Sequence, residues 1–464
     1  MKKNYVKAGF YYSLGNIFIK GIAFLSLPIF THILSTADFG RFNLFLSYEN
    51  ILAIIIGLGI TGTVRTAYFD SSIQFNRYIS STIFLITFFS ILTYLSSKYF
   101  FLTNISFFDK WIADLLGILF ISAFSSALYN LISAKYVIEG AYKANLFFSF
   151  IYTFLNISIS IILCITYFRN ECFIGRILGN TIPLFFIATS ISFFILFKER
   201  VFFNKDYWKY AVSMGGPLIF HSLSIVIMQQ IDKIIINKFC GDSYTGIYSL
   251  ACTISIILTI ILSSIDNAWA PWFYKKLKER DYTSLNKNNK KIVIFFFFIT
   301  SIVTVISPEI IRIIAPVSYG DAIFSLIPLT ISIYANFMYL FAINKEYFYK
   351  QTKWIALATI FTTILDIVLN YLFIPKFGYI SAAYTTLLCK VVLFAIHWGV
   401  SKKIDSYDVV SLNLLLCTLM IVATVGGITI IFLDNYVVRF FILLLFLIAL
   451  VYTYKDYLKK IIER

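Results

Sequence analysis

The chain is poor in charged residues and very poor in histidine. Charged side chains make up 13% of its 464 residues, and there are three histidines, whereas a typical soluble domain is about 25% charged. With 59% hydrophobic residues and a mean hydropathy of +0.83, such a chain does not stay dispersed in water. These deficits exclude a disordered chain and an ordinary soluble enzyme, and they favour a multi-pass membrane protein.

Cysteine is also scarce. The six cysteines lie mostly in apolar runs, and no two of them have metal-ligand spacing. This pattern excludes a disulfide scaffold and predicts small buried core residues, with no metal site and no cofactor. The sequence likewise lacks a nucleophile constellation, so we expect no catalytic residues and no enzyme activity.

Long apolar stretches dominate the chain. A helix crosses the hydrocarbon core of a bilayer with about 20 apolar residues. We count fourteen such stretches, at residues 8–34, 42–64, 78–97, 111–134, 144–168, 173–197, 210–236, 246–266, 292–307, 322–343, 354–374, 380–400, 410–432 and 436–454. The longest connection, 267–291, is too short for a soluble domain. The basic N-terminus resembles the start of a signal peptide, but the apolar run after it is too long, so we expect an uncleaved first span.

The positions of lysine and arginine predict the orientation. If the N-terminus is cytoplasmic, 27 of the 39 basic residues fall on the inside and nine, including Arg176, on the outside. This bias predicts fourteen spans with both termini in the cytoplasm. It also explains the net charge of +16 without a nucleic-acid partner. The basic loops are expected to attract anionic membrane lipids.

Two halves of the sequence resemble each other. LPIFTHILSTADFGRFNLF (27–45) aligns with DKIIINKFCGDSYTGIYSL (232–250), which places Gly40 opposite Gly246, and Gly175 aligns with Gly378 at nearly the same offset. An even number of spans in each half makes the repeats parallel. We therefore predict an all-α fold with six-helix bundles at 1–200 and 201–404 around a central cavity, and two additional spans in 405–464.

Three lysines lie within the predicted spans, at Lys20, Lys233 and Lys390. A lysine at mid-span costs about 2.5–3.5 kcal/mol unless it has water, a partner or an anionic ligand. Asn16 lies one helical turn before Lys20, and Gln229 lies one turn before Lys233. These residues predict a cationic lumen that attracts an anionic substrate.

Two alternatives remain for these lysines. Lys233 could pair with Asp232 or reach the membrane surface. Lys20 and Lys390 could form buried ion pairs with acidic residues of other spans, namely Glu49, Asp114 or Asp366. Polar stripes such as Asn145, Ser149, Asn156 and Ser160 in the fifth span predict helices with one face on lipid and one face on a wet lumen.

Five stretches resemble the Wzx-type polysaccharide flippases of the MOP (multidrug/oligosaccharidyl-lipid/polysaccharide) exporter superfamily. They are PIFTHILSTADFGRF (28–42), GLGITGTVRTAYFD (57–70), PLIFHSLSIVIMQQIDKIIINKF (217–239), NAWAPWFYKKL (267–277) and IPKFGYISAAYTTLL (374–388). The resemblance extends to about residue 400. It implies a flippase of the bacterial cytoplasmic membrane that moves undecaprenyl-pyrophosphate-linked oligosaccharide units, such as O-antigen units, to the outer leaflet. Implied partners are a polymerase and chain-length proteins of the same pathway.

The resemblance also implies site residues. A cationic cavity in this family would here use Lys20, Arg65, Lys233 and Lys390, with Asn16 and Gln229 beside them. Lysine binds phosphate as a point charge, without the two-pronged geometry of arginine. Coupling to an ion gradient is implied too, and the candidates for it are Asp366, Glu49 and Asp266.

Two other functions remain open. A MATE-like, cation-coupled multidrug exporter would need acidic residues deep in its cavity, whereas the mid-span residues Lys20 and Lys390 are basic. A membrane glycan polymerase or glycosyltransferase would need a large outer loop or an acidic motif there, and the predicted outer loops are short. The sequence therefore favours the flippase.

The span count makes a prediction about the C-terminus. A reporter fused after Arg464 should be active in the cytoplasm, because fourteen spans return the chain to the side on which it started. Paired cytoplasmic and extracellular reporters at this position measure the outcome. Extracellular activity would overturn the count.

Overall fold

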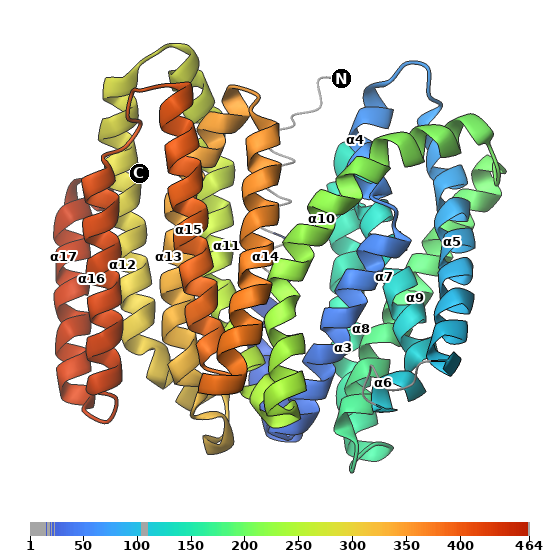
Figure 1. Cartoon of the computed structure of the whole chain (residues 1–464), viewed down its shortest axis with the longest axis horizontal. Coiled ribbons are helices and arrows are strands. Elements are labelled where there is room, and N and C mark those ends of the chain that lie inside the picture. The colour runs from blue at the N-terminus through green and yellow to red at the C-terminus, as the bar shows by residue number, and fades with distance from the viewer. Residues whose placement is uncertain (1–14, 16–18, 20, 23, 104–109, 463–464) are drawn as a thin grey trace. The chain divides into compact units, whose positions relative to one another are not determined.

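The structure is a computed structural model that describes residues 15, 19, 21, 22, 24–103 and 110–462. These residues form helices and no strand (Figure 1). Thirteen of the helices are long and apolar enough to cross a membrane. The prediction of an all-α, multi-pass membrane protein is therefore confirmed.

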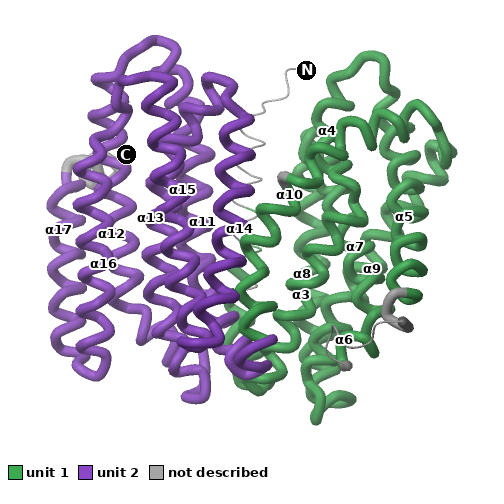
Figure 2. The backbone as a smooth tube through the Cα atoms, in the orientation of Figure 1, with its two compact units in different colours: residues 1–237 green, residues 238–464 purple. Residues whose placement is uncertain are grey.

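The chain divides into two compact units, residues 1–237 and 238–464 (Figure 2). The helices that begin in the first unit are α2 (Leu27–Ile33), α3 (Thr36–Ile56), α4 (Ile60–Phe69), α5 (Phe75–Thr103), α6 (Lys110–Asp114), α7 (Leu116–Ile138), α8 (Tyr142–Thr166), α9 (Cys172–Glu199) and α10 (Lys205–Cys240). Within this unit, α9 packs against α8, α7, α5 and α3.

The second unit is built around one buried helix. Its helices are α11 (Asp242–Lys278), α12 (Tyr282–Ile314), the short 3-10 turn η2 (Val317–Tyr319), α13 (Ala322–Phe348), α14 (Thr352–Phe377), α15 (Ser381–Ile404), α16 (Leu412–Ile431) and α17 (Tyr436–Ile462). Helix α13 packs against α15, α11, α12 and α16. The last helix, α17, packs against α12 and leaves most of its surface exposed.

Large apolar side chains cover the outer faces of many helices. Examples in both units are Phe88, Leu95, Phe193, Phe194, Phe440, Phe441 and Leu444. A soluble monomer rarely exposes so much contiguous apolar surface. These faces suit contact with lipid chains, as expected for membrane-spanning helices.

Thirteen of the fourteen predicted spans coincide with long helices. The exception is the first, 8–34, of which the structure describes α2 and a few residues before it. The candidate site residues Asn16 and Lys20 lie outside the described residues.

The helices are longer than the apolar stretches that predicted them. The expected connection 267–291 is helical almost throughout, because α11 ends at Lys278 and α12 begins at Tyr282. Asp281 caps α12 by accepting a hydrogen bond from the backbone N–H of Ser284 at 3.0 Å. Hydropathy marks only the part of a helix that lies in hydrocarbon, so it underestimates the length of helices that continue past the membrane surface.

The second predicted span, 42–64, is broken. Helix α3 ends at Ile56 and α4 begins at Ile60, and between them Leu58 and Gly59 adopt left-handed φ values of 51° and 65°. The break crosses α10 at Gly215 with the two backbones in contact. A Cβ atom at Gly215 would lie 2.6 Å from the carbonyl oxygen of Leu58, so only glycine fits there.

One of the two repeat alignments coincides with the helices. Helix α3 begins four residues before Gly40, and α11 begins four residues before Gly246. In contrast, Gly175 lies inside α9, whereas Gly378 follows α14 with a φ of 76°. The predicted bundle boundaries at residues 200 and 404 stay a prediction, although the beginning of α10 packs into the first unit through Tyr207 and Trp208.

The crossing of the break with α10 can be tested by a pair of neighbouring glycines. Gly215→Ala should destabilise the protein by about 1–3 kcal/mol, because its methyl group would press on the Leu58 carbonyl. Gly216→Ala is the matched control, since a Cβ there meets nothing within 4 Å. The melting temperature in detergent measures both variants, and equal melting temperatures would contradict the close contact.

Candidate functional site

A buried carboxylate lies at the centre of the first unit. Glu49, on α3, is 5% exposed. It accepts hydrogen bonds from the hydroxyls of Ser122, at 2.7 Å, and Ser126, both on α7, and from the Asn180 amide of α9 at 3.5 Å. Two helices, α7 and α9, therefore contribute three donors to one acidic group of α3, which satisfies it away from water.

A cation lies at the other end of the same network. The Arg176 guanidinium, on α9, donates hydrogen bonds to Asn156 and, at 2.7 Å, to Ser160. It also lies 4.0 Å from the ring centroid of Phe30, a cation–π distance. The Asn156 amide donates to Asn180 at 3.0 Å, so hydrogen bonds run from the Glu49 carboxylate to the Arg176 guanidinium.

The sequence predicted part of this network. The polar stripe of the fifth span lies on α8, where Asn156 and Ser160 bind Arg176 and Ser149 bonds with Tyr129 at 2.6 Å. That this face borders a wet lumen stays a prediction. Arg176 was predicted on the outside of the membrane, and its side of the membrane stays a prediction. Its side chain lies on α9 and binds residues of α8. These contacts with α8 do not follow from the basic-residue count that assigned Arg176 to a side.

An open cavity of about 660 Å³ surrounds Arg65 in the first unit. Helix α4 supplies Thr61, Arg65, Tyr68 and Phe69, and α7 supplies apolar residues that include Val137. Arg65 is exposed, as are Tyr68 and Phe69. The cavity combines one cation with two aromatic rings and a hydroxyl, a set suited to an anionic group attached to a sugar.

Two other predicted binding residues lie on α10. Lys233 is half-buried, and its ammonium donates to the side chain of Gln230 at 3.2 Å. Gln230 in turn accepts from Ser47 of α3 at 3.0 Å. Gln229 is exposed. Lys233 is thus tied to α3 through a neutral amide.

The predicted acidic candidate Asp366 is buried between α14 and α15 in the second unit. It is 1% exposed and accepts from Asn370 at 3.3 Å, while the Thr385 hydroxyl of α15 donates to the Asn370 oxygen at 2.6 Å. Lys390, also on α15, is half-buried. A hydrogen-bonded chain therefore leads from Asp366 through the Asn370 amide to the Thr385 hydroxyl.

A second polar layer lies near the ends of α11, α13 and α15. The predicted candidate Asp266 is half-buried and accepts from Asn344 at 3.2 Å. Nearby in sequence, Glu346 is fully buried, and its carboxylate oxygens lie 2.9 and 3.0 Å from Nδ1 of His397. This pair could not be predicted from the sequence, because nothing in the spacing links a residue of α13 to one of α15.

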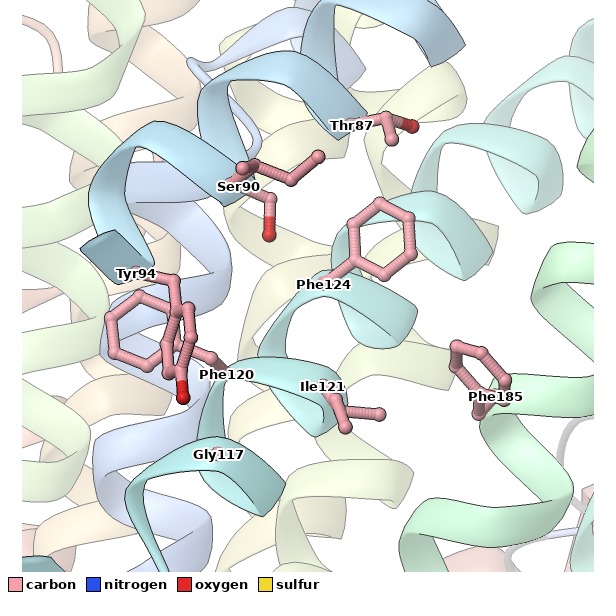
Figure 3. A pocket seen from close by; sticks show the side chains of 9 residues that line it. Thr87, Ser90, Tyr94, Gly117, Phe120, Ile121, Phe124 and Phe185 are labelled. Atoms are coloured by element: carbon pink, nitrogen blue, oxygen red, sulfur yellow. The ribbon is translucent and has the colours of Figure 1, made fainter. Parts of the chain in front are cut away.

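A different kind of cavity lies between α5, α7 and α9 (Figure 3). It measures about 380 Å³, and its walls include Tyr94, Phe120, Phe124 and Phe185. The hydroxyl of Thr87 is bound to the carbonyl of its own helix, at Ile83. This cavity suits hydrocarbon and not a charged head group.

The predicted binding residues are divided between the two units. Arg65, Gln229 and Lys233 belong to the first unit and Lys390 to the second. Whether they face one chamber stays a prediction. Among the described residues, no group of three or more His, Cys, Asp or Glu side chains is placed to hold a metal ion.

Comparisons with known proteins agree with this architecture. The family of polysaccharide biosynthesis proteins matches residues 5–277. An uncharacterized membrane protein of Haemophilus influenzae is 22% identical over 420 residues, which cover 87% of this chain and 98% of that protein.

Two solved structures share the fold. The lipid II flippase MurJ, in an inward closed conformation, matches with a TM-score of 0.70 and 16% identity over 97% of this chain and 100% of its own. An inward-facing multidrug resistance MATE family transporter of the MOP superfamily matches with a TM-score of 0.64 and 14% identity, over 83% and 94% of the two chains.

These matches confirm the resemblance that the sequence motifs indicated. The structural neighbours are transporters and flippases, and the thirteen spans agree with a multi-pass membrane location. The chain therefore belongs to the family of polysaccharide biosynthesis proteins.

Proposed function

We propose that the chain moves undecaprenyl-pyrophosphate-linked oligosaccharide units from the inner to the outer leaflet of the bacterial cytoplasmic membrane. Such transport needs no covalent chemistry. It requires a protein that shields a polar head from hydrocarbon while the polyprenyl tail stays in lipid. Two helical units that open alternately to either side provide this in related transporter folds.

The cavity around Arg65 is the observation that carries the proposal. A guanidinium binds a phosphate group through two parallel hydrogen bonds. Tyr68 and Phe69 beside it offer aromatic faces to sugar rings, and the volume of about 660 Å³ admits a group of that size. Arg65 follows the second predicted span on the basic side of the membrane, where a substrate made in the cytoplasm would arrive.

The other candidates extend this proposal. Lys233 and Gln229 of the first unit and Lys390 of the second would line the path of the head group, with Asn16 and Lys20 before them in the chain. Lysines that line a chamber attract phosphate without imposing a fixed contact geometry. Such weakly directional binding suits a head group that has to leave the site during translocation.

Asp366 is the proposed site of ion coupling. Asp366 is a buried carboxylate that is linked by hydrogen bonds to the oxygen-bearing side chains of Asn370 and Thr385 on α14 and α15, and such groups suit a small cation or a proton. Glu49 already accepts hydrogen bonds from α7 and α9, and Asp266 accepts one from Asn344. These two carboxylates are therefore weaker candidates for ion coupling than Asp366.

A cation-coupled multidrug exporter is the second candidate. The buried carboxylates of Glu49 and Asp366 favour it, because such exporters need deep acidic groups. The exposed Arg65 in an open cavity favours an anionic substrate instead. A glycan polymerase or glycosyltransferase has no support from the site.

Replacing Arg65 tests the substrate assignment. Arg65→Ala should lower surface-glycan display about tenfold or more in cells that depend on this chain, since a charge-assisted hydrogen bond is worth about 1.5–3 kcal/mol. Arg77→Ala is the matched control, because Arg77 is exposed and lies outside the cavity lining. Immunoblots verify equal protein in the membrane. Full display by Arg65→Ala, or export of cationic dyes without glycan display, would contradict the proposal.

Replacing Asp366 tests the coupling site. Asp366→Asn keeps the size and shape of the side chain and removes its charge. Surface-glycan display should therefore fall, and the remaining display should no longer depend on the ion gradient. Asp321→Asn, at an exposed carboxylate of the same unit, should behave as wild type. Display is measured with the gradient intact and after an ionophore collapses it. Gradient-dependent transport in Asp366→Asn would exclude this role.

A further inference from the structure

A third cavity lies between α11, α12 and α17 in the second unit. Its volume is about 510 Å³. Trp272 comes from the last third of α11, Asn288 and Lys291 come from the beginning of α12, and Tyr454 comes from the last third of α17. The cavity therefore lies at the end of the second unit where α11 is followed by α12. The basic residues of 275–291, called the basic connection below, lie at this end and have no role in the proposed transport.

The lining changes character along the cavity. Ile265 and Phe295 are apolar, and Phe295 is 38% exposed on the outer face of α12. Asn288 and Lys291 are polar and lie toward the connection. Trp272 and Tyr454 contribute amphipathic rings, which in membrane proteins gather at the level of the lipid head groups. A ligand that fills this space must itself be apolar at one end and polar at the other.

The walls of the cavity are held by hydrogen bonds. Trp269 donates its indole N–H to Asn289 at 2.8 Å, and the Asn289 amide donates to the carbonyl of Val409 at 2.8 Å. The hydroxyl of Tyr454 donates to the carbonyl of Lys291, which ties α17 to α12. These hydrogen bonds fix the positions of the helices that form the walls of the cavity.

Charge around the polar end is strongly positive. Lys276 is neutralised by Glu279 and Asp281, both at 2.9 Å, and its hydrogen bond lowers the pKa of Asp281 to about 2. The neighbouring cations Lys275, Lys278, Arg280, Lys287 and Lys290 are exposed. A negative group is therefore favoured at this end, whereas the cavity of Figure 3 has no charged lining residue.

We propose that the cavity between α11, α12 and α17 binds an anionic glycerophospholipid of the surrounding membrane. Its phosphate lies toward Asn288 and Lys291, and one acyl chain follows Ile265 and Phe295. Such a lipid fills the space between α17 and the body of the unit, and it therefore stabilises the attachment of the last helix. This site is separate from the proposed transport of oligosaccharide and does not depend on it.

Thermal denaturation of the purified full-length chain in detergent tests the site. Phosphatidylglycerol should raise the melting temperature more than phosphatidylcholine, whereas inorganic phosphate should leave it unchanged because it lacks the acyl chain. Lys291→Ala should weaken the effect of phosphatidylglycerol about tenfold in lipid concentration. Lys287→Ala is the matched control, since it removes an exposed lysine of the same helix that does not line the cavity.

Two results would overturn the proposal. One is equal stabilisation by phosphatidylglycerol and phosphatidylcholine. The other is an equal loss in Lys287→Ala and Lys291→Ala, which would mean diffuse attraction to the basic connection. If Lys291→Ala does not fold, native mass spectrometry of wild type and Lys287→Ala tests the proposal instead. Both proteins should retain one phosphatidylglycerol molecule in preference to phosphatidylcholine, and no such preference would overturn the proposal.

Discussion

A charge in a hydrocarbon environment has to be balanced inside the protein, and the first unit is organised around that requirement. Removing one partner of a buried ionic network costs about 3–5 kcal/mol, because the other charge stays uncompensated. Glu49 and Arg176 lie at opposite ends of one network, and Asn156 and Asn180 carry hydrogen bonds between them. This network joins α3, α7, α8 and α9, so the same contacts that balance the charges also fix the helices to one another.

The second unit meets the requirement with several smaller groups. Asp366 accepts a hydrogen bond from Asn370, which in turn accepts one from Thr385, and Glu346 contacts His397 directly. Each group joins two helices, α14 to α15 and α13 to α15. This arrangement suits the proposed transport, because local groups can change partners while the rest of the unit stays intact. The single long network of the first unit has less freedom of this kind.

Hydropathy predicted the helical class and the positions of thirteen spans, because it acts on stretches of many residues. Details set by single contacts could not be predicted in this way. The left-handed turn at Leu58 depends on the approach of α10, which comes about 150 residues later in the chain. Similarly, Arg176 joins the interior only because α8 presents Asn156 and Ser160 to it. Of the predicted binding residues, Arg65 lies in an open cavity, while Lys233 is tied to Gln230.

The contact between the α3–α4 turn and Gly215 constrains how this sequence can diverge. In most helix crossings a larger residue on one side is accommodated by a smaller one on the other. Here the position opposite Gly215 is the backbone around Leu58 and Gly59, which has no side chain left to shorten. No compensating substitution is therefore available, and a descendant sequence can lose this glycine only by moving the two helices apart.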